Sequence, residues 1–163
     1  MYITLDKYAT IYDPIDEKTF NRISFEACRI MDNHTTGLDG VKKLKLYHPT
    51  DPDDRETVER CAAKIINLLH QIQEAESAAA IGRGYIETDQ GLQRKIISRV
   101  EAGNEAISYS ETKLANTAID SAAADKFVRD KLISETVREC LSGISDINGV
   151  NLLYMGPYPR RRL

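Results

Sequence analysis

The chain has 163 residues, of which 42% are hydrophobic and 29% charged, enough for one domain with a modest core. Its 22 basic and 25 acidic residues give a formal net charge of -3, which excludes the general polyanion-binding surface that a whole-chain basic excess provides. The three cysteines are widely separated and form neither a disulfide framework nor a zinc pattern, and no stretch approaches membrane-spanning length, so we expect a cytoplasmic protein that binds no membrane.

Two helices are predicted in the first third of the chain. Thr4 is placed to cap a short helix that runs through Tyr12 and stops before Pro14, because the residue before a proline is pushed out of the helical region. A second helix begins near Asp16 and ends around residues 33–37. Apolar residues three and four apart form one stripe along it, which should face the core: Phe20, Ile23, Ala27, Ile30 and Met31.

The strongest periodic signal lies in the next helix, which Pro52 begins and which Thr50 or Asp51 is placed to cap. We expect this helix to be a central packing element and to continue to about Ile81. Its apolar face consists of Val58, Cys61, Ala62, Ile65, Leu68, Leu69 and Ile72. Gly82-Arg83-Gly84 lacks the preceding strand and following helix of a phosphate-binding loop, so we predict a helix end and a flexible loop over residues 82–95.

Past Gly91 the period of the sequence changes from helical to alternating. The alternation predicts a β-hairpin with strands at Ile96–Glu101 and Ala106–Ser110 and turn chemistry at Gly103-Asn104. An isolated hairpin is marginally stable in water, so this one needs packing from helices or from strands of a neighbour.

After a polar linker at residues 111–117, a last helix is predicted from about Ser121 to Leu141, with Gly143 as its terminator. Cysteines at helical spacing among apolar residues behave as small hydrophobic groups, so we expect all three to pack in the core. The apolar side of this helix is predicted to consist of Phe127, Val128, Leu132, Val137, Cys140, Leu141 and Ile144.

The C-terminal segment, about residues 146–163, carries the apolar run Leu152-Leu153-Tyr154-Met155 and ends in a basic tail at Arg160–Arg162. Glycine and proline on both sides argue against a helix, so the segment should be extended or turned. Chain ends are normally polar, so these side chains need a surface, either on their own domain or on another protein. We favour an arm that docks on a partner, and we expect deletion of residues 150–163 to leave a folded domain.

The sequence has no motif that indicates catalysis or metal binding. His34, His48 and His70 lie on different predicted elements without the paired spacing or nearby cysteines of metal sites. The acidic residues of 51–54 could bind a cation, but their position at a helix start is explained by the helix dipole. No serine or cysteine lies in a nucleophile elbow. We therefore expect a protein that is not an enzyme and that holds no metal and no cofactor.

The order of the parts is more informative than any single motif. A Tyr-x-Thr opening at Tyr2–Thr4 precedes three helices, a hairpin, a last helix and a closing Leu-Leu-Tyr-x-Gly. Ser98–Ser110 contains a serine, then a glycine, then an alternating strand that ends in tyrosine. Gly149–Gly156 resembles a Gly-Leu-Leu-Tyr-Arg-Gly ending, with Asn151 interrupting the first junction and Met155 in place of the basic residue. These features resemble the tailed-phage head-tail connector, or adaptor, family.

The resemblance implies a mainly α fold: a small bundle of about three to four helices, one β-hairpin before the last helix, and an extended C-terminal arm. The core would span about residues 1–145 and the docking arm about 146–163. It implies a structural virion protein that forms a ring of identical subunits under the portal and joins the DNA-filled head to the tail. DNA would pass through the channel without sequence-specific binding.

The resemblance also implies the partners and their contact residues. The portal protein and a downstream stopper or tail protein would bind the ring, which would assemble in the host cytoplasm and reside in the virion neck. The basic tail has two plausible partners, carboxylates of the portal and phosphates of DNA in the channel. We favour portal carboxylates, because the tail follows the docking arm and arginine forks suit bidentate pairing. The hairpin would form the subunit interface through Val100, Ile107 and Tyr109. The portal contacts would be Leu152, Leu153, Tyr154, Met155, Arg160, Arg161 and Arg162.

Two alternatives remain open. The first is a small cytoplasmic helical binding or regulatory module whose basic tail touches nucleic acid. The second is a small enzyme, which a pocket with convergent polar groups would distinguish.

Overall fold

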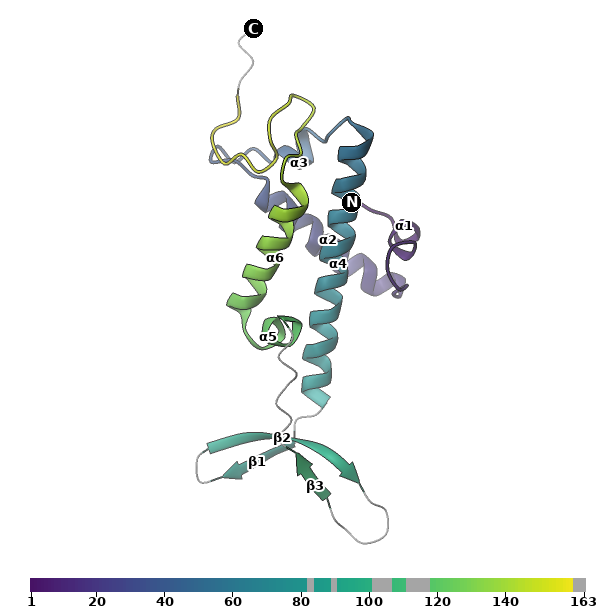
Figure 1. Cartoon of the computed structure of the whole chain (residues 1–163), viewed down its shortest axis with the longest axis vertical. Coiled ribbons are helices and arrows are strands. Elements are labelled where there is room, and N and C mark those ends of the chain that lie inside the picture. The colour runs from purple at the N-terminus through teal and green to yellow at the C-terminus, as the bar shows by residue number, and fades with distance from the viewer. Residues whose placement is uncertain (82–83, 89–90, 101–106, 111–117, 160–163) are drawn as a thin grey trace. The chain divides into compact units, whose positions relative to one another are not determined.

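The computed structural model describes the chain except residues 82–83, 89–90, 101–106, 111–117 and 160–163, and describes side chains only outside residues 78–117 (Figure 1). The fold is mainly helical, as predicted, with six helices in the described part of the chain. The chain divides into two compact units, residues 1–70 with 130–163 and residues 71–129. We call the first of these the helical unit. The expectation of one domain stays a prediction.

The N-terminal helices begin where their capping residues predict. The Thr4 hydroxyl accepts a hydrogen bond from the Lys7 amide at 3.4 Å, and the Asp16 carboxylate accepts one from the Thr19 amide at 2.9 Å. Each bond satisfies an amide that has no partner within the first turn. The helices that follow are α1 (Leu5–Ala9), α2 (Glu17–His34) and the short α3 (Lys43–Leu46).

The long predicted helix is α4 (Pro52–Ile81), and its start is also capped. The Asp51 carboxylate accepts hydrogen bonds from the amides of Asp53 at 2.9 Å and Asp54 at 3.4 Å. This geometry explains the position of Asp51 through helix capping.

The predicted last helix is two helices, α5 (Ala118–Ala124) and α6 (Lys126–Leu141). The Asp125 carboxylate accepts a hydrogen bond from the Phe127 amide at 2.7 Å and so starts α6 anew. Because the restart shifts the buried face, the predicted apolar side is wrong in part: Phe127 is 76% exposed, and Ile133 is buried where Leu132 was expected.

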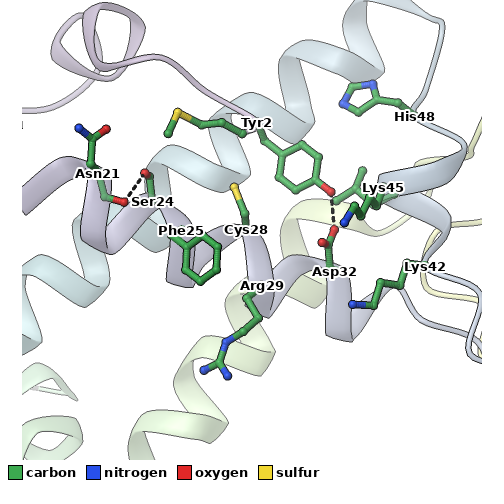
Figure 2. A pocket seen from close by; sticks show the side chains of 12 residues that line it. Tyr2, Asn21, Ser24, Phe25, Cys28, Arg29, Asp32, Lys42, Lys45 and His48 are labelled. Carbon is green, nitrogen blue, oxygen red and sulfur yellow. Dashed lines mark hydrogen bonds between the residues drawn. The ribbon is translucent and has the colours of Figure 1, made fainter.

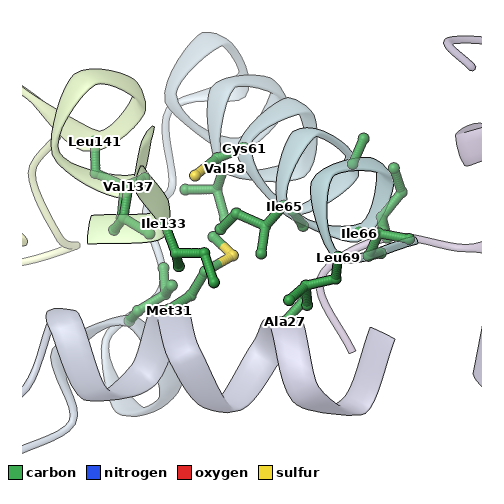
Figure 3. Close-up of a cluster of buried hydrophobic side chains, with 14 of the residues drawn as sticks. Ala27, Met31, Val58, Cys61, Ile65, Ile66, Leu69, Ile133, Val137 and Leu141 are labelled. Carbon is green, nitrogen blue, oxygen red and sulfur yellow. The ribbon is translucent and has the colours of Figure 1, made fainter. Parts of the chain in front are cut away.

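The core of the helical unit lies where α2, α4 and α6 meet (Figure 3). The α1 helix adds the fully buried Tyr8, whose ring centroid lies 5.7 Å from that of Phe20. Full burial of one large apolar side chain contributes about 1.5–3 kcal/mol. The buried side chains labelled in Figure 3 include Ala27 and Met31 of α2, Val58, Cys61 and Ile65 of α4, and Ile133, Val137 and Leu141 of α6.

Three antiparallel strands follow α4 in the order β1-β2-β3: β1 (Gly84–Thr88), β2 (Gly91–Val100) and β3 (Ile107–Ser110). The predicted loop over residues 82–95 is therefore wrong for its described part, which pairs Gly84 with Lys95 and Thr88 with Gly91. Val100 pairs with Ile107, with a register shift between Ile97 and Arg99. The turn at Gly103-Asn104 lies outside the described residues, so the hairpin as a whole stays a prediction.

Candidate partner-binding site

The C-terminal segment is irregular, as predicted, but it packs on the chain's own helical unit. Gly143, at a φ of 84°, ends α6, and the Leu152 amide then donates to the Ile144 carbonyl at 2.9 Å. Leu152 is fully buried in the core, and Leu153 packs against it half-buried. The predicted portal contact at Leu152 is wrong, because a side chain buried in its own domain is not accessible to a partner.

Asp146 organises the turn that brings the segment back. Its buried carboxylate accepts hydrogen bonds from the amides of Asn148 at 2.8 Å and Val150 at 2.9 Å. The Tyr158 hydroxyl donates to the other oxygen of Asp146 at 2.5 Å. Burial, together with this bond, raises the pKa of Tyr158 to about 12. Tyr158 therefore keeps its proton at neutral pH and remains a donor.

Tyr158 also attaches the segment to residues on both sides of α3. Its ring stacks on Tyr47 at a centroid distance of 4.7 Å and an interplanar angle of 15°. Its amide donates to the Asp39 carboxylate at 2.7 Å, and this bond holds the pKa of Asp39 below its ordinary value. Residues far apart in the sequence thus fix both ends of the segment from Asp146 to Tyr158.

Lys43 holds the middle of the segment. Its side chain is only 1% exposed, and its ammonium donates to the Tyr154 carbonyl and lies 5.9 Å from the centroid of the Tyr154 ring. Burial lowers the pKa of Lys43, while the charges of Asp146 and Asp39 act in the opposite direction. Lys43 was not predicted from the sequence, because a lysine on a four-residue helix carries no pattern that indicates burial.

Two glycines allow the backbone to approach closely at this site. A Cβ atom on Gly37 would lie 2.8 Å from the Gly156 carbonyl oxygen, and one on Gly156 would lie 2.8 Å from Cε1 of Tyr154. The Leu38 amide donates to the Met155 carbonyl at 2.9 Å. The glycine of the closing Leu-Leu-Tyr-x-Gly is therefore explained by the Tyr154 ring that folds over it.

The anchored segment leaves an apolar surface in solvent. Leu38 is 82% exposed, Tyr154 45% and Met155 54%, and the bond between Leu38 and Met155 places these residues together. We call these three residues the C-terminal apolar surface. It contains two of the predicted portal contacts, Tyr154 and Met155. Large exposed apolar groups in one place are typical of interaction sites.

The remaining predicted contacts, apart from Leu152 and Leu153, belong to parts of the chain whose side chains the structure does not describe. Arg160, Arg161 and Arg162 lie outside the described residues, so their contact with portal carboxylates stays a prediction. Val100, Ile107 and Tyr109 lie on β2 and β3, where Val100 pairs with Ile107 and Ile97 with Tyr109. Their role in a subunit interface also stays a prediction.

Within the described part of the chain, no group of three or more histidine, cysteine, aspartate or glutamate side chains could hold a metal ion. No helix among the described residues has the length and apolar character needed to cross a membrane. Comparison of the chain with protein-family models, curated proteins and solved structures found no match.

Proposed function

We propose that the chain is a structural protein of the head-tail connector type, which forms a ring under the portal of a tailed phage and joins the filled head to the tail. The sequence resemblance suggests this function, and the C-terminal apolar surface is the observation that supports it best. The closing Leu-Leu-Tyr-x-Gly holds Tyr154 and Met155 outward on a segment that Lys43, Asp39 and Asp146 anchor.

An anchored surface suits a docking role for an energetic reason. Ordering a free arm on binding costs about 0.5–1.5 kcal/mol for each immobilised side chain with many rotamers. Here the backbone of Tyr154 and Met155 is already held by Lys43 and Leu38, so less of that cost falls on association. Tyrosine and methionine are also enriched in protein interfaces. The portal would therefore contact Leu38, Tyr154 and Met155, with Leu153 at the edge.

The strand order supports the proposed ring. β1 and β3 are the outer strands in the order β1-β2-β3, and an outer strand offers unpaired backbone groups to another chain. In a ring, one face of each subunit contacts a different face of the next. The hairpin with Val100, Ile107 and Tyr109 would provide one of these faces. The assembled ring would lie in the virion neck, with DNA passing through its channel.

The portal contact is tested by coexpression with the portal protein encoded in the same phage genome, followed by affinity purification and negative-stain imaging. Leu38→Glu and Met155→Glu should each weaken portal association at least about tenfold, since each places a charge in an apolar contact. Phe127→Glu is the matched control, because Phe127 is also an exposed apolar residue but lies elsewhere in the chain. Equal portal binding by all three variants would contradict the proposal.

The ring is tested separately by native mass spectrometry of the protein alone and in complex with the portal. A proline at Ile107 removes a backbone donor from β3. We expect Ile107→Pro to reduce assembly while the helical content measured by circular dichroism is unchanged. If Ile107→Pro unfolds the protein and reduces assembly in parallel, the strands serve the fold and not the ring.

A further inference from the structure

The helical unit has a second surface feature, a groove of about 630 Å³ against α2 (Figure 2). Its walls come from α2, from the segment around α3 and from Tyr2 near the N-terminus. None of the residues of the C-terminal apolar surface lines it. The residues that matter for its chemistry are Phe25, Cys28, Arg29, Asp32, Lys42 and Lys45.

The groove carries three cations that the described residues do not neutralise. Arg29, Lys42 and Lys45 are exposed, and their side chains make no hydrogen bond or ion pair with any described residue. The single carboxylate of the groove, Asp32, accepts a hydrogen bond from the Tyr2 hydroxyl. Three cations against one carboxylate make the groove basic, although the whole chain has a net charge of -3.

The groove is also lined by apolar side chains. Phe25 is 74% exposed on α2, and Figure 2 shows its ring near the centre of the site. Leu44 is fully buried, and Cys28 is half-buried beside it in the lining. Tyr2 stacks on His48 at a centroid distance of 6.0 Å and forms a further wall. An exposed phenylalanine that lines one groove with three unpaired cations is a combination that an isolated domain does not need for its own stability.

We propose that this groove binds an acidic segment of a partner protein that carries both carboxylates and an apolar or aromatic side chain. The carboxylates pair with Arg29, Lys42 and Lys45, and the apolar side chain packs on Phe25. Charge complementarity of this kind steers encounter and sets register, while the apolar contact supplies the buried area. The inference does not depend on the connector function, because it rests on the groove alone.

The same cations attract phosphate, so nucleic acid is the competing ligand. A nucleic-acid site usually follows several phosphates along a basic stripe. Here the basic groups line one groove together with Phe25, and the Asp32 carboxylate also lines it. A peptide with both carboxylates and an apolar side chain fits these groups, whereas a phosphate backbone alone leaves Phe25 without a contact. A single strand can stack a base on Phe25, so the test compares the peptide directly with single-stranded DNA.

The test uses the full chain and a fluorescein-labelled twelve-residue peptide of three repeats of EELF, measured by fluorescence anisotropy. We expect saturable binding that weakens as NaCl is raised, because exposed charge pairs are screened. Two variants should reduce affinity at least about tenfold: the double variant Lys42→Ala with Lys45→Ala, and Phe25→Ala. The matched control is Lys18→Ala with Lys126→Ala, which removes the same charge from exposed positions outside the groove and should change affinity less than about twofold.

A second readout locates the peptide. Cys28 lines the groove and Cys140 does not, although both thiols are partly exposed. The peptide should therefore slow maleimide labelling of Cys28, mapped by mass spectrometry, and leave labelling of Cys140 unchanged. Circular dichroism confirms that each variant is folded.

Three outcomes would overturn the proposal. The first is no binding of the EELF peptide at 100 μM in low salt, or equal binding of a KKLF peptide. The second is an equal loss of affinity in the control double variant. The third is that a twelve-nucleotide single strand binds more tightly than the peptide and protects Cys28, which would assign the groove to nucleic acid.

Discussion

Two surfaces of the helical unit use neighbouring lysines in opposite ways. Lys43 is buried and donates to the Tyr154 carbonyl, so its charge serves the fold of the C-terminal segment. Lys42 and Lys45 are exposed and unpaired among the described residues, so their charges remain available to a ligand. The type of residue alone therefore does not assign a role to these lysines. They differ in whether the chain itself provides a hydrogen-bond acceptor for the ammonium group.

The C-terminal segment repeats this contrast with apolar residues. Leu152 is fully buried, whereas Met155, three positions later, is 54% exposed. The segment is therefore a part of the core at Leu152 and an exposed apolar surface at Tyr154 and Met155. Substitutions test the contrast between a buried residue and its exposed counterpart, Lys43 against Lys42 and Lys45 and Leu152 against Met155. The buried residue should affect the free energy of unfolding, and the exposed residue should affect association with a partner.

The largest effect is expected for Leu152→Ala. Removing a fully buried leucine side chain leaves a cavity and costs about 2–5 kcal/mol of unfolding free energy. Met155→Ala should change this free energy by less than about 0.5 kcal/mol, since Met155 is mostly exposed. Urea denaturation monitored by circular dichroism measures both. Equal stabilities of the two variants would show that the segment is a free arm after all, as the sequence led us to expect.

A smaller loss, about 2 kcal/mol, is expected for Lys43→Met. Methionine is similar in length but cannot donate, so the Tyr154 carbonyl loses its ammonium partner. Lys42→Met and Lys45→Met are matched controls on the same segment and should be neutral for stability. Limited proteolysis provides a second measurement: cleavage within residues 146–159 should accelerate only in Lys43→Met. Accelerated cleavage in all three variants would remove the distinction between the lysines.

Local chemistry was sufficient to predict the starts of the helices. Thr4, Asp16 and Asp51 cap their helices by accepting hydrogen bonds from amides two or three residues ahead. Because both partners are close in the sequence, the residue type and its position are enough to predict the cap. The core stripe of α4 was predicted for the same reason, from a period of three and four. The interruption between α5 and α6 at Asp125 was not predicted. Aspartate is a favoured capping residue, so the sequence did indicate a helix start there.

The site was less predictable because it depends on contacts between distant residues. An apolar run needs a surface to pack on. In a segment without helical or strand periodicity, the sequence does not indicate whether that surface is the protein's own core or a partner. The answer for Leu152 comes from its bond to Ile144 and its place among α2, α4 and α6. The burial of Lys43 was unpredictable for the same reason, because its hydrogen-bond acceptor, the Tyr154 carbonyl, lies 111 residues away in the sequence.

Gly156→Ala should cost about 1 kcal/mol, near the lower end for overpacking, because the clashing Tyr154 ring is partly exposed and can move. A double-mutant cycle isolates the cause. In a Tyr154→Ala background the added methyl meets no ring, so Gly156→Ala should become nearly neutral and the two changes should be clearly non-additive. Additive effects in urea denaturation would mean that the ring does not cover Gly156 in solution.

The smallest effect is expected from acid, at the contact between Asp39 and the Tyr158 amide. The hydrogen bond from the Tyr158 amide favours the charged form of Asp39. It lowers the pKa of Asp39 in the folded state below the ordinary aspartate value of about 3.9. The contact therefore contributes its full stability above that value and loses it as the pH falls through the lower, folded pKa.

The chemical shift of the Tyr158 amide, followed by NMR from pH 6 to 2.5, should titrate below pH 4 and return toward a random-coil value. Asp39→Asn should abolish this titration and leave that of the Thr19 amide, which reports on the equivalent Asp16 cap, unchanged. If the Tyr158 amide shift stays constant over this range, the segment is held by Lys43, Tyr47 and Asp146 without help from Asp39.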